Sequence, residues 1–320
     1  GQRPAGAKRT MVDIFCGAGG TSCGARMAGF EPVIAVDNWE PACKTYRENF
    51  PQAAVFEQDV TSFIHHKLRH KTHVDVLHIS PPCQPYSPAH TRAGRNDERN
   101  IAALFSSEVI DKLRPRLATL EQTYGITHEA HVGFFHALLQ SYTRRNFSVR
   151  WKIVRFLEYG LPQIRRRLVM ICSCPGEKLP TFPPATHGNV TGRARAHAMA
   201  ARGQGLKPYM TEAQAIGNIP RRATLHDVDG AFPVNVPAHD PNLPLARTIT
   251  CGGAEKKYHY SGKRAYTVRE LACLQGFPIT YQFLGTAQTV IRKQVGNAFP
   301  PSVVKVIYEH LRAWLDELDR

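Results

Sequence analysis

Cys83 stands where a thiol could act as a nucleophile. The sequence Pro81-Pro-Cys-Gln84 follows residues 74–79, an apolar run typical of a buried strand, so we expect the thiol at the carboxyl end of that strand. The polar segment 84–100 comes next, which argues against the other common role of a lone cysteine, a small buried hydrophobe. A thiolate in this setting could attack an electrophilic carbon.

An acid and two arginines could share the cavity of that thiol. Glu121 directly follows the short apolar run 117–120, which we expect to be a strand ending at the acid. Gln163-x-Arg165-x-Arg167 has the period of two that would place all three side chains on one face of a strand. Guanidinium groups lower the pKa of a thiol and bind phosphate or base oxygens. A solvated basic strand is the alternative interpretation.

A glycine-rich turn follows the apolar run 11–16. Phe15-x-Gly17-x-Gly19-Gly20 would let a ligand approach the backbone, and the helix expected over 21–28 offers unpaired N–H groups at its start. The spacing is neither the dinucleotide fingerprint nor a P-loop. Taken alone, the pattern also fits a tight turn that binds nothing.

Carboxylates at the ends of the next two expected strands make the ligand interpretation stronger. Asp37 ends the run 32–36, at the place where a ribose diol is bound in nucleotide-binding sheets, and Trp39 could stack on a purine. Asp59 follows the run 54–56 and could accept a hydrogen bond from an adenine amino group. Together these residues predict a pocket for an adenosyl group.

Length and composition predict a folded, basic protein of about two domains. The chain has 320 residues, with 41 Lys and Arg against 26 Asp and Glu and a formal net charge of +15, which favours nucleic acid or another polyanion as partner. No apolar stretch reaches transmembrane length, so we expect a soluble intracellular protein without a membrane partner. The eight cysteines form no C-x-x-C pair and the histidines have no zinc-site spacing, so we expect reduced thiols and no metal.

Alternating strand and helix patterns predict an α/β fold with a doubly wound sheet that binds ligands at the carboxyl ends of its strands. From Pro175 to Ala246 the sequence is rich in Pro and Gly and has only weak strand or helix periodicity. We therefore expect a catalytic domain over 1–174, a small recognition domain over 175–246, and a return to the catalytic domain over 247–320. The chain begins with Gly1, so we expect regulatory domains or proteins outside this sequence.

Several motifs, in order, resemble those of the cytosine-C5 DNA methyltransferases. The family's cofactor turn is similar to Asp13-Ile-Phe-Cys-Gly-Ala-Gly-Gly20, and its nucleophile and arginine motifs are similar to the two already described. Two later segments, Arg247-Thr-Ile-Thr250 and Arg269-Glu-Leu-Ala-Cys-Leu-Gln-Gly-Phe-Pro278, precede the closing motif Gln294-Val-Gly-Asn-Ala-Phe-Pro-Pro301. The resemblance implies a Rossmann-like S-adenosylmethionine-dependent methyltransferase sheet, with the target-recognition domain at 175–246.

The resemblance also implies a covalent mechanism and its residues. Cys83 would add to C6 of a flipped cytosine in double-stranded DNA, Glu121 would contact N3 and the amine, Arg165 would hold the O2 side, and Arg167 would steady the thiol or a phosphate. The base for the C5 proton stays open. The residues implied for S-adenosyl-L-methionine, which leaves as S-adenosyl-L-homocysteine, are Phe15, Gly17, Ala18, Gly19, Gly20, Asp37, Trp39, Asp59, Val60, Pro81, Asn297 and Ala298. Those implied for DNA are Gln84, Ser87, Arg92, Arg95, Arg99 and Gln163, with further phosphate contacts from the basic segment 141–170.

One motif departs from the family. Most members have Glu-Asn-Val where this chain has Glu121-Gln122-Thr123, a variant that resembles the fungal branch linked to premeiotic silencing of repeats, and hence implies a nuclear enzyme of epigenetic silencing. The longer Gln122 side chain must pack differently behind the acid. Two alternatives remain open. One is an RNA cytosine methyltransferase, which lacks support because the Cys-Phe-Thr signature of tRNA-modifying relatives is absent from 175–246; the other is a catalytically silent DNA-binding or scaffold relative.

Overall fold

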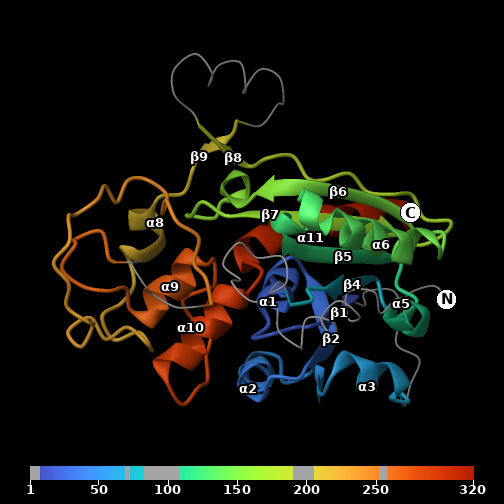
Figure 1. Ribbon diagram of the computed structural model, residues 1–320, viewed down its shortest axis with the longest axis horizontal. Helices are drawn as coiled ribbons and strands as arrows, with labels where there is room; N and C mark the ends of the chain where they lie inside the picture. Colours follow the sequence, from blue (N-terminus) through green and yellow to red (C-terminus); the bar gives the residue numbers. More distant parts are fainter. Residues whose placement is uncertain (1–7, 69–72, 83–107, 190–204, 252–257) are drawn as a thin grey trace.

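A seven-stranded sheet forms the centre of the molecule (Figure 1). The computed structural model describes residues 8–68, 73–82, 108–189, 205–251 and 258–320. The strand order is β3-β2-β1-β4-β5-β7-β6; neighbours from β3 to β5 pair in parallel, and β7 is antiparallel to both β5 and β6. The strands are β1 (Arg9–Ile14), β2 (Phe30–Asp37), β3 (Ala54–Glu57), β4 (Val76–Ile79), β5 (Leu117–Thr123), β6 (Ser148–Arg155) and β7 (Arg166–Ser173).

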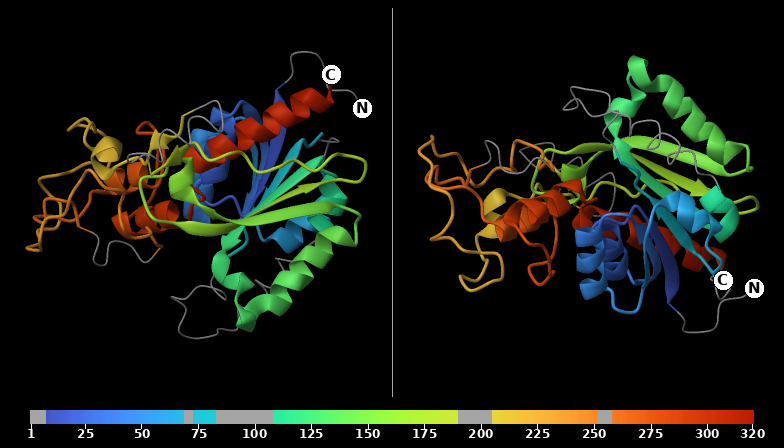
Figure 2. Two further views of the ribbon diagram at one scale, coloured as in Figure 1. Left: turned by 90° about the horizontal axis from the view of Figure 1, so that it is seen from above. Right: turned by 60° about the horizontal axis from the view of Figure 1, so that its bottom comes forward.

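Helices cover both faces of this sheet, so the predicted doubly wound α/β fold is confirmed (Figure 2). One face packs against α3, α5 and α6, and the other against α1 and α11. The helices are α1 (Gly20–Met27), α2 (Glu40–Asn49), α3 (Val60–His65), α5 (Glu108–Leu113), α6 (Val132–Thr143), α8 (Glu212–Ile216), α9 (Val268–Leu274), α10 (Gln288–Asn297) and α11 (Pro301–Leu318), with 3-10 turns η2 (Tyr124–Thr127), η3 (Glu129–His131) and η4 (Phe156–Tyr159). Among the residues that the structure describes, no helix combines the length and apolarity needed to cross a bilayer.

The C-terminal helix α11 buries the apolar face that its sequence predicts. Val303, Ile307 and Leu311 are fully or almost fully buried, and they pack with β1 and α1. Gly24 in α1 is required for this contact, because a Cβ there would lie 2.5 Å from the Pro301 carbonyl oxygen and from Val304. The close approach places the segment just before α11 beside the glycine turn.

In the region 175–246, residues 205–246 lie to one side of the sheet together with α9 and α10 (Figure 1). The first residues run along the sheet instead, where Glu177 pairs with Arg116 and Phe182 packs against the cluster that contains α11. The described part of this region contains α8 and a short parallel pair, β8 (His187–Gly188) and β9 (Lys207–Pro208). Its buried residues Ile216 and Leu245 belong to the same apolar cluster as Leu271 of α9 and Tyr46 of α2. The region therefore shares its core with the flanking segments.

Two predictions about strand boundaries are wrong: that a strand ends at Glu121, and that Gln163, Arg165 and Arg167 share one strand face. The antiparallel pairing of β5 with β7 explains both. Thr123 pairs with Arg167 and Glu121 with Val169, so β5 continues for three residues past its apolar run and the acid lies inside the strand. Gln163 and Arg165 precede β7, which begins at Arg166, so the three residues of the arginine motif do not share one strand face. Backbone pairing, which apolar periodicity does not report, sets both boundaries.

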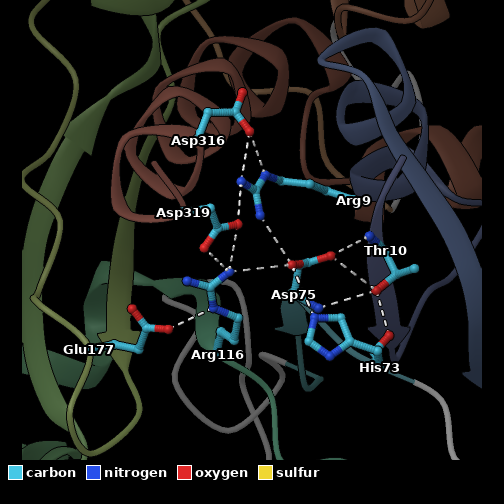
Figure 3. Close-up of polar contacts among 8 residues, drawn as sticks. All are labelled: Arg9, Thr10, His73, Asp75, Arg116, Glu177, Asp316 and Asp319. Atoms are coloured by element: carbon cyan, nitrogen blue, oxygen red, sulfur yellow. Dashed lines mark hydrogen bonds and ion pairs between the residues drawn. The ribbon is translucent and has the colours of Figure 1, made fainter. Parts of the chain in front are cut away.

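Arg9, at the start of β1, is buried at the centre of an ion-pair cluster that reaches the surface (Figure 3). Its guanidinium lies 3.2 Å from Asp75 before β4, and 2.7 and 2.9 Å from Asp316 and Asp319 at the end of α11. Arg116, before β5, also pairs with Asp319. The cluster ties α11 to the amino-terminal ends of three parallel strands, the sheet edge opposite their carboxyl ends.

Replacing Arg9 with methionine should lower the free energy of unfolding by about 3–5 kcal/mol, because Asp75 would stay buried without the arginine nearest to it. The Asp75 side chain is 0% exposed. Urea unfolding measures the change. The control is Arg221→Met, which breaks an ion pair with Asp229 whose side chains are 80% and 77% exposed, and which should change stability by less than about 1 kcal/mol. Equal effects of the two substitutions would contradict the expectation.

Candidate active site

The glycine turn after β1 combines one open position with two packed ones. Gly17 has φ 50° and a Cβ there would meet no atom within 4 Å, so the backbone is open to a ligand. At Gly19 a Cβ would lie 2.7 Å from the Phe50 ring, and at Gly20 it would lie 2.6 Å from the Phe299 carbonyl oxygen. The turn therefore needs glycine for two reasons: ligand approach at Gly17 and close packing at the other two.

Asp37, at the end of β2, shapes this turn. Its carboxylate accepts hydrogen bonds from the backbone N–H groups of Gly17 and Trp39, each at 2.8 Å. Burial raises the pKa of Asp37, and these hydrogen bonds oppose the rise. The residue thus lies at the predicted adenosyl pocket, with its oxygens already engaged by the backbone that would surround a ribose.

Three further residues of the predicted adenosyl pocket, Trp39, Asp59 and Val60, follow the ends of β2 and β3. Lys293 of α10 lies 4.5 Å from the centroid of the Trp39 ring, a cation–π contact that covers part of that ring. Asp59 caps α3, where its Oδ1 accepts from Thr61 N at 2.9 Å, and Val60 is the first residue of that helix. The strand order places β1, β2 and β3 side by side, so their carboxyl ends form one edge as the sequence predicts.

The closing motif lies against the glycine turn. A Cβ on Gly20 would come within 2.9 Å of the Ala298 Cβ, and the Ala298 carbonyl accepts a hydrogen bond from Gln275 at 2.9 Å. Asn297 is exposed at the end of α10. Residues from the two ends of the chain are thus neighbours at the predicted cofactor site. The open Gly17 and the adjacent aromatic and carboxylate residues fit an adenosyl cofactor.

Asp13 of β1, two residues before the glycine turn begins at Phe15, is completely buried. Ser22 Oγ donates to Asp13 Oδ2 at 2.6 Å and lies 2.7 Å from the hydroxyl of Tyr46. The other carboxylate oxygen makes no hydrogen bond to any described residue. Burial raises the pKa of Asp13 to about 7, although the Ser22 hydrogen bond lowers it in part.

Glu121 and Arg167 form an ion pair at the centre of the site. Arg167 Nε lies 3.0 Å from Glu121 Oε1, and the two side chains are 15% and 12% exposed. The pair spans β5 and the first residues of β7, as the antiparallel register requires. A carboxylate and a guanidinium that are partly shielded from water can orient a polar heterocycle.

Arg165 and Gln163 are buried and hold three segments together. Arg165 donates to the carbonyls of Ile249 at 2.8 Å and Gly296 at 3.4 Å. The Gln163 side chain is 0% exposed; it accepts from Ile249 N at 3.0 Å and donates to Gln275 Oε1 at 2.8 Å. In this structure the Gln163 side chain therefore contacts protein, and it does not face the surface where the prediction places DNA.

Ser80 and Pro81, which lead to Cys83, each form a hydrogen bond with a buried side chain. Ser80 Oγ lies 2.7 Å from His78 Nε2, and the Pro81 carbonyl, which is buried, accepts from Gln122 Nε2 at 3.3 Å. Cys83 and the predicted DNA contacts Gln84, Ser87, Arg92, Arg95 and Arg99 lie outside the described residues, so their predicted roles stay predictions.

The basic segment 141–170 contains both paired and exposed cations. Arg145 pairs with Asp111 at 2.7 Å and Arg155 with Glu158 at 3.6 Å. Arg166 is exposed beside the site, with its guanidinium 5.1 Å from the centroid of the Tyr124 ring. The exposed basic residues of the segment are Arg144, Arg150, Lys152, Arg155 and Arg166. No group of three or more metal-ligating side chains occurs in the described part of the chain.

Sequence reasoning missed His78, Gln275 and Lys293. A histidine inside the apolar run 74–79 is itself a signal, because a buried polar side chain needs a hydrogen-bond partner. Gln275 belongs to the predicted motif 269–278, but its side-chain role was not predicted, and Lys293 carries no signal, since their partners lie far away in the sequence. Only the fold brings them to the site.

Comparison with known proteins identifies relatives along almost the whole chain. The family model described as C-5 cytosine-specific DNA methylase matches residues 9–192 and 187–313. Type II methyltransferase M1.HphI of Haemophilus parahaemolyticus is 32% identical over 328 residues, covering 94% of this chain and 86% of the relative. Type II methyltransferase M.NgoFVII of Neisseria gonorrhoeae is 28% identical, covering 93% and 84%.

Solved structures share the fold. A structure from an E. coli prophage, described as a candidate DNA modification methyltransferase, has a TM-score of 0.65 at 20% identity and covers 96% of this chain and 99% of its own. The S. pombe Dnmt2 methyltransferase has a TM-score of 0.62 at 14% identity and covers 97% and 99%. At these identities the comparison supports the fold alone.

The buried Asp13 predicts a pH dependence of stability. Its pKa rises from the ordinary 3.8 to about 7 in the folded chain, so the folded state binds the proton more tightly. The stability that this tighter proton binding contributes is fully present below the unfolded pKa of 3.8 and is lost as the pH rises through the folded pKa of about 7. Between about pH 4 and pH 7 the wild type should therefore lose stability relative to Asp13→Asn, which does not titrate, and above this range the difference should stay constant. Urea unfolding across this range measures both chains, and parallel pH profiles would contradict the assignment.

Two glycine substitutions should separate ligand approach from packing. Gly17→Ala has space for its methyl group but strains a backbone with positive φ, so it should cost roughly 1–2 kcal/mol of stability and weaken binding of the predicted cofactor, S-adenosylmethionine, at least about tenfold. Gly20→Ala should reduce stability more, because its Cβ would clash with the Phe299 carbonyl. Calorimetric titration and thermal unfolding measure the two effects. If Gly17→Ala binds the cofactor like the wild type, the turn is not the cofactor site.

Proposed function

Because the chain belongs to the C-5 cytosine-specific DNA methylase family, we propose that it transfers the methyl group of S-adenosyl-L-methionine to C5 of a cytosine in double-stranded DNA. The observation that carries this proposal is the Glu121–Arg167 ion pair, 3.0 Å long, at the sheet edge where Gln122 also contacts the segment leading to Cys83. The acid, the arginine and the thiol motif are the groups that covalent chemistry on cytosine needs.

In the proposed reaction the Cys83 thiolate adds to C6 of the cytosine. A sulfur–carbon bond forms, and the ring electrons move toward C5 and N3. C5 then forms a bond to the methyl group, while the bond between that methyl group and the cofactor sulfur breaks and S-adenosyl-L-homocysteine leaves. A base takes the C5 proton, and the returning electrons expel the thiolate. S-adenosyl-L-methionine supplies the electrophilic methyl group, and Gly17 and Trp39 are the residues that fit its adenosyl part.

Glu121 and the arginines are proposed to hold the ring during this addition. Glu121, carrying a proton, would donate a hydrogen bond to N3, where negative charge develops, and would also contact the exocyclic amine. Arg165, oriented by the carbonyls of Ile249 and Gly296, would hold the O2 side. Arg167 keeps the acid in place through their ion pair. These roles match a polar heterocycle bound edge-on at the end of β5, beside the start of β7.

The target cytosine is proposed to flip out of the duplex, because a stacked base could not reach a residue at the sheet edge. The net charge of +15 supports DNA as the partner. Exposed Lys152, level with Glu121 in the sheet register, and Arg166 fit phosphate contacts, and the region 175–246 is proposed to select the target sequence.

The biological setting is proposed from one motif. Glu121-Gln122-Thr123 supports a place in the fungal branch linked to premeiotic silencing, and hence a nuclear enzyme of epigenetic silencing. The relatives named above are bacterial Type II methyltransferases.

The function is tested by transfer of labelled methyl groups from S-adenosylmethionine to duplex DNA. Wild type should transfer and should form a covalent adduct with a duplex containing 5-fluorocytosine, because fluorine blocks the final elimination. Cys83→Ala should abolish both, and Glu121→Gln should lower the rate by about 10²–10⁴-fold. Cys174→Ala, which changes a half-buried cysteine after β7, is the matched control and should keep the wild-type rate. Transfer to RNA alone, or cofactor binding without any transfer, would overturn the proposal.

A further inference from the structure

A chain of hydrogen bonds, buried except at its last contact, runs from the C-terminal helix to Ser80, three positions before Cys83. The Tyr308 hydroxyl on α11 lies 2.9 Å from Thr119 Oγ1 on β5, and that oxygen lies 2.8 Å from His78 Nδ1 on β4. The other ring nitrogen, Nε2, lies 2.7 Å from Ser80 Oγ. Four side chains thus connect the inside of the sheet to the start of the nucleophile motif.

His78 is fixed in this chain by its surroundings. Its side chain is 0% exposed, and its ring lies 5.7 Å from that of Phe299, in the closing motif. Burial lowers the pKa of His78 to about 3, so the imidazole is neutral at physiological pH. In a neutral imidazole one nitrogen donates and the other accepts. The ring therefore makes two hydrogen bonds of opposite sense, one with Thr119 and one with Ser80.

Pro81, the residue after Ser80, is held by a hydrogen bond from Gln122. Gln122 is 1% exposed, and its Oε1 accepts from Thr123 N at 2.8 Å, which directs Nε2 toward the Pro81 carbonyl at 3.3 Å. Ser80 and Pro81 are therefore each held by a polar side chain from the core. The backbone adds a third tie, because Ser80 N donates to the Ile14 carbonyl at 3.2 Å.

We propose that His78 and Gln122 are positioning residues that fix Ser80 and Pro81, and so set where the nucleophile motif leaves the sheet. The inference rests on the proposed function, in which Cys83 attacks cytosine. Pro81 and Pro82 have restricted backbones, so an anchor at Ser80 and Pro81 constrains the chain that follows. Buried polar groups with satisfied hydrogen bonds favour one conformation over its competitors. This also gives a role to the glutamine that replaces the family's asparagine.

The proposal is tested first with a pair of substitutions at Thr119. Thr119→Val keeps the shape and removes the hydroxyl, whereas Thr119→Ser keeps the hydroxyl and removes a methyl group. Thr119→Val should lower the single-turnover methyl-transfer rate about tenfold, because small displacements of a reacting group are costly. Thr119→Ser should transfer faster than Thr119→Val.

Ser80→Ala and Gln122→Leu remove the two contacts at the motif itself. Each should lower the single-turnover rate about tenfold, while the KM for S-adenosylmethionine and the Kd for DNA change by less than about twofold. The control is Tyr159→Phe, which removes a buried hydroxyl that donates to the Pro183 carbonyl at 2.9 Å, away from the motif. It should lower the melting temperature without changing the rate.

Hydrogen exchange of the Ser80 amide gives a readout that needs no activity. Exchange should accelerate in Ser80→Ala and Thr119→Val and stay at the wild-type rate in Tyr159→Phe. Wild-type transfer rates in Ser80→Ala and Gln122→Leu would overturn the inference, as would equal losses in Thr119→Ser and Thr119→Val. If the wild type transfers no methyl group, the proposed function fails, and unchanged Ser80 exchange in the variants would separately refute the anchoring.

Discussion

The antiparallel pairing of β7 with β5 is the constraint on which the site depends. Because β7 runs against its neighbour, its first residues meet the last residues of β5, and Arg167 reaches Glu121. A parallel strand would have placed the arginines at the far edge of the sheet. The same reversal leaves Arg165 just outside the strand, where it reaches the carbonyls of Ile249 and Gly296.

Buried polar contacts then join segments that the chain separates widely. Gln163, Gln275 and Ala298 form a run of amide hydrogen bonds from the arginine motif to the closing motif. His78 and Gln122 do the same for the nucleophile motif. Each contact satisfies a group that would be costly to bury alone. The site is therefore held by the core and does not depend on surface loops alone.

The opposite edge of the sheet supplies the stability that such a site needs. Arg9 and its three carboxylate partners fasten α11 to the starts of the parallel strands. The close contact of Gly24 with Pro301 then places the closing motif beside the glycine turn. One helix thus connects the ion-pair cluster at one edge with the predicted cofactor site at the other.

The sequence by itself determined the strand and helix alternation, the buried face of α11, and the order of the motifs, because these follow from local periodicity and turn chemistry. It also placed Asp37 and Asp59 at neighbouring strand ends, since parallel strands share an edge. Only the tertiary structure decided that β5 extends past Glu121, that Gln163 is buried, and that His78, Gln275 and Lys293 join the site. Those facts depend on strand register and on partners that are distant in the chain, and neither leaves a periodic trace in the sequence.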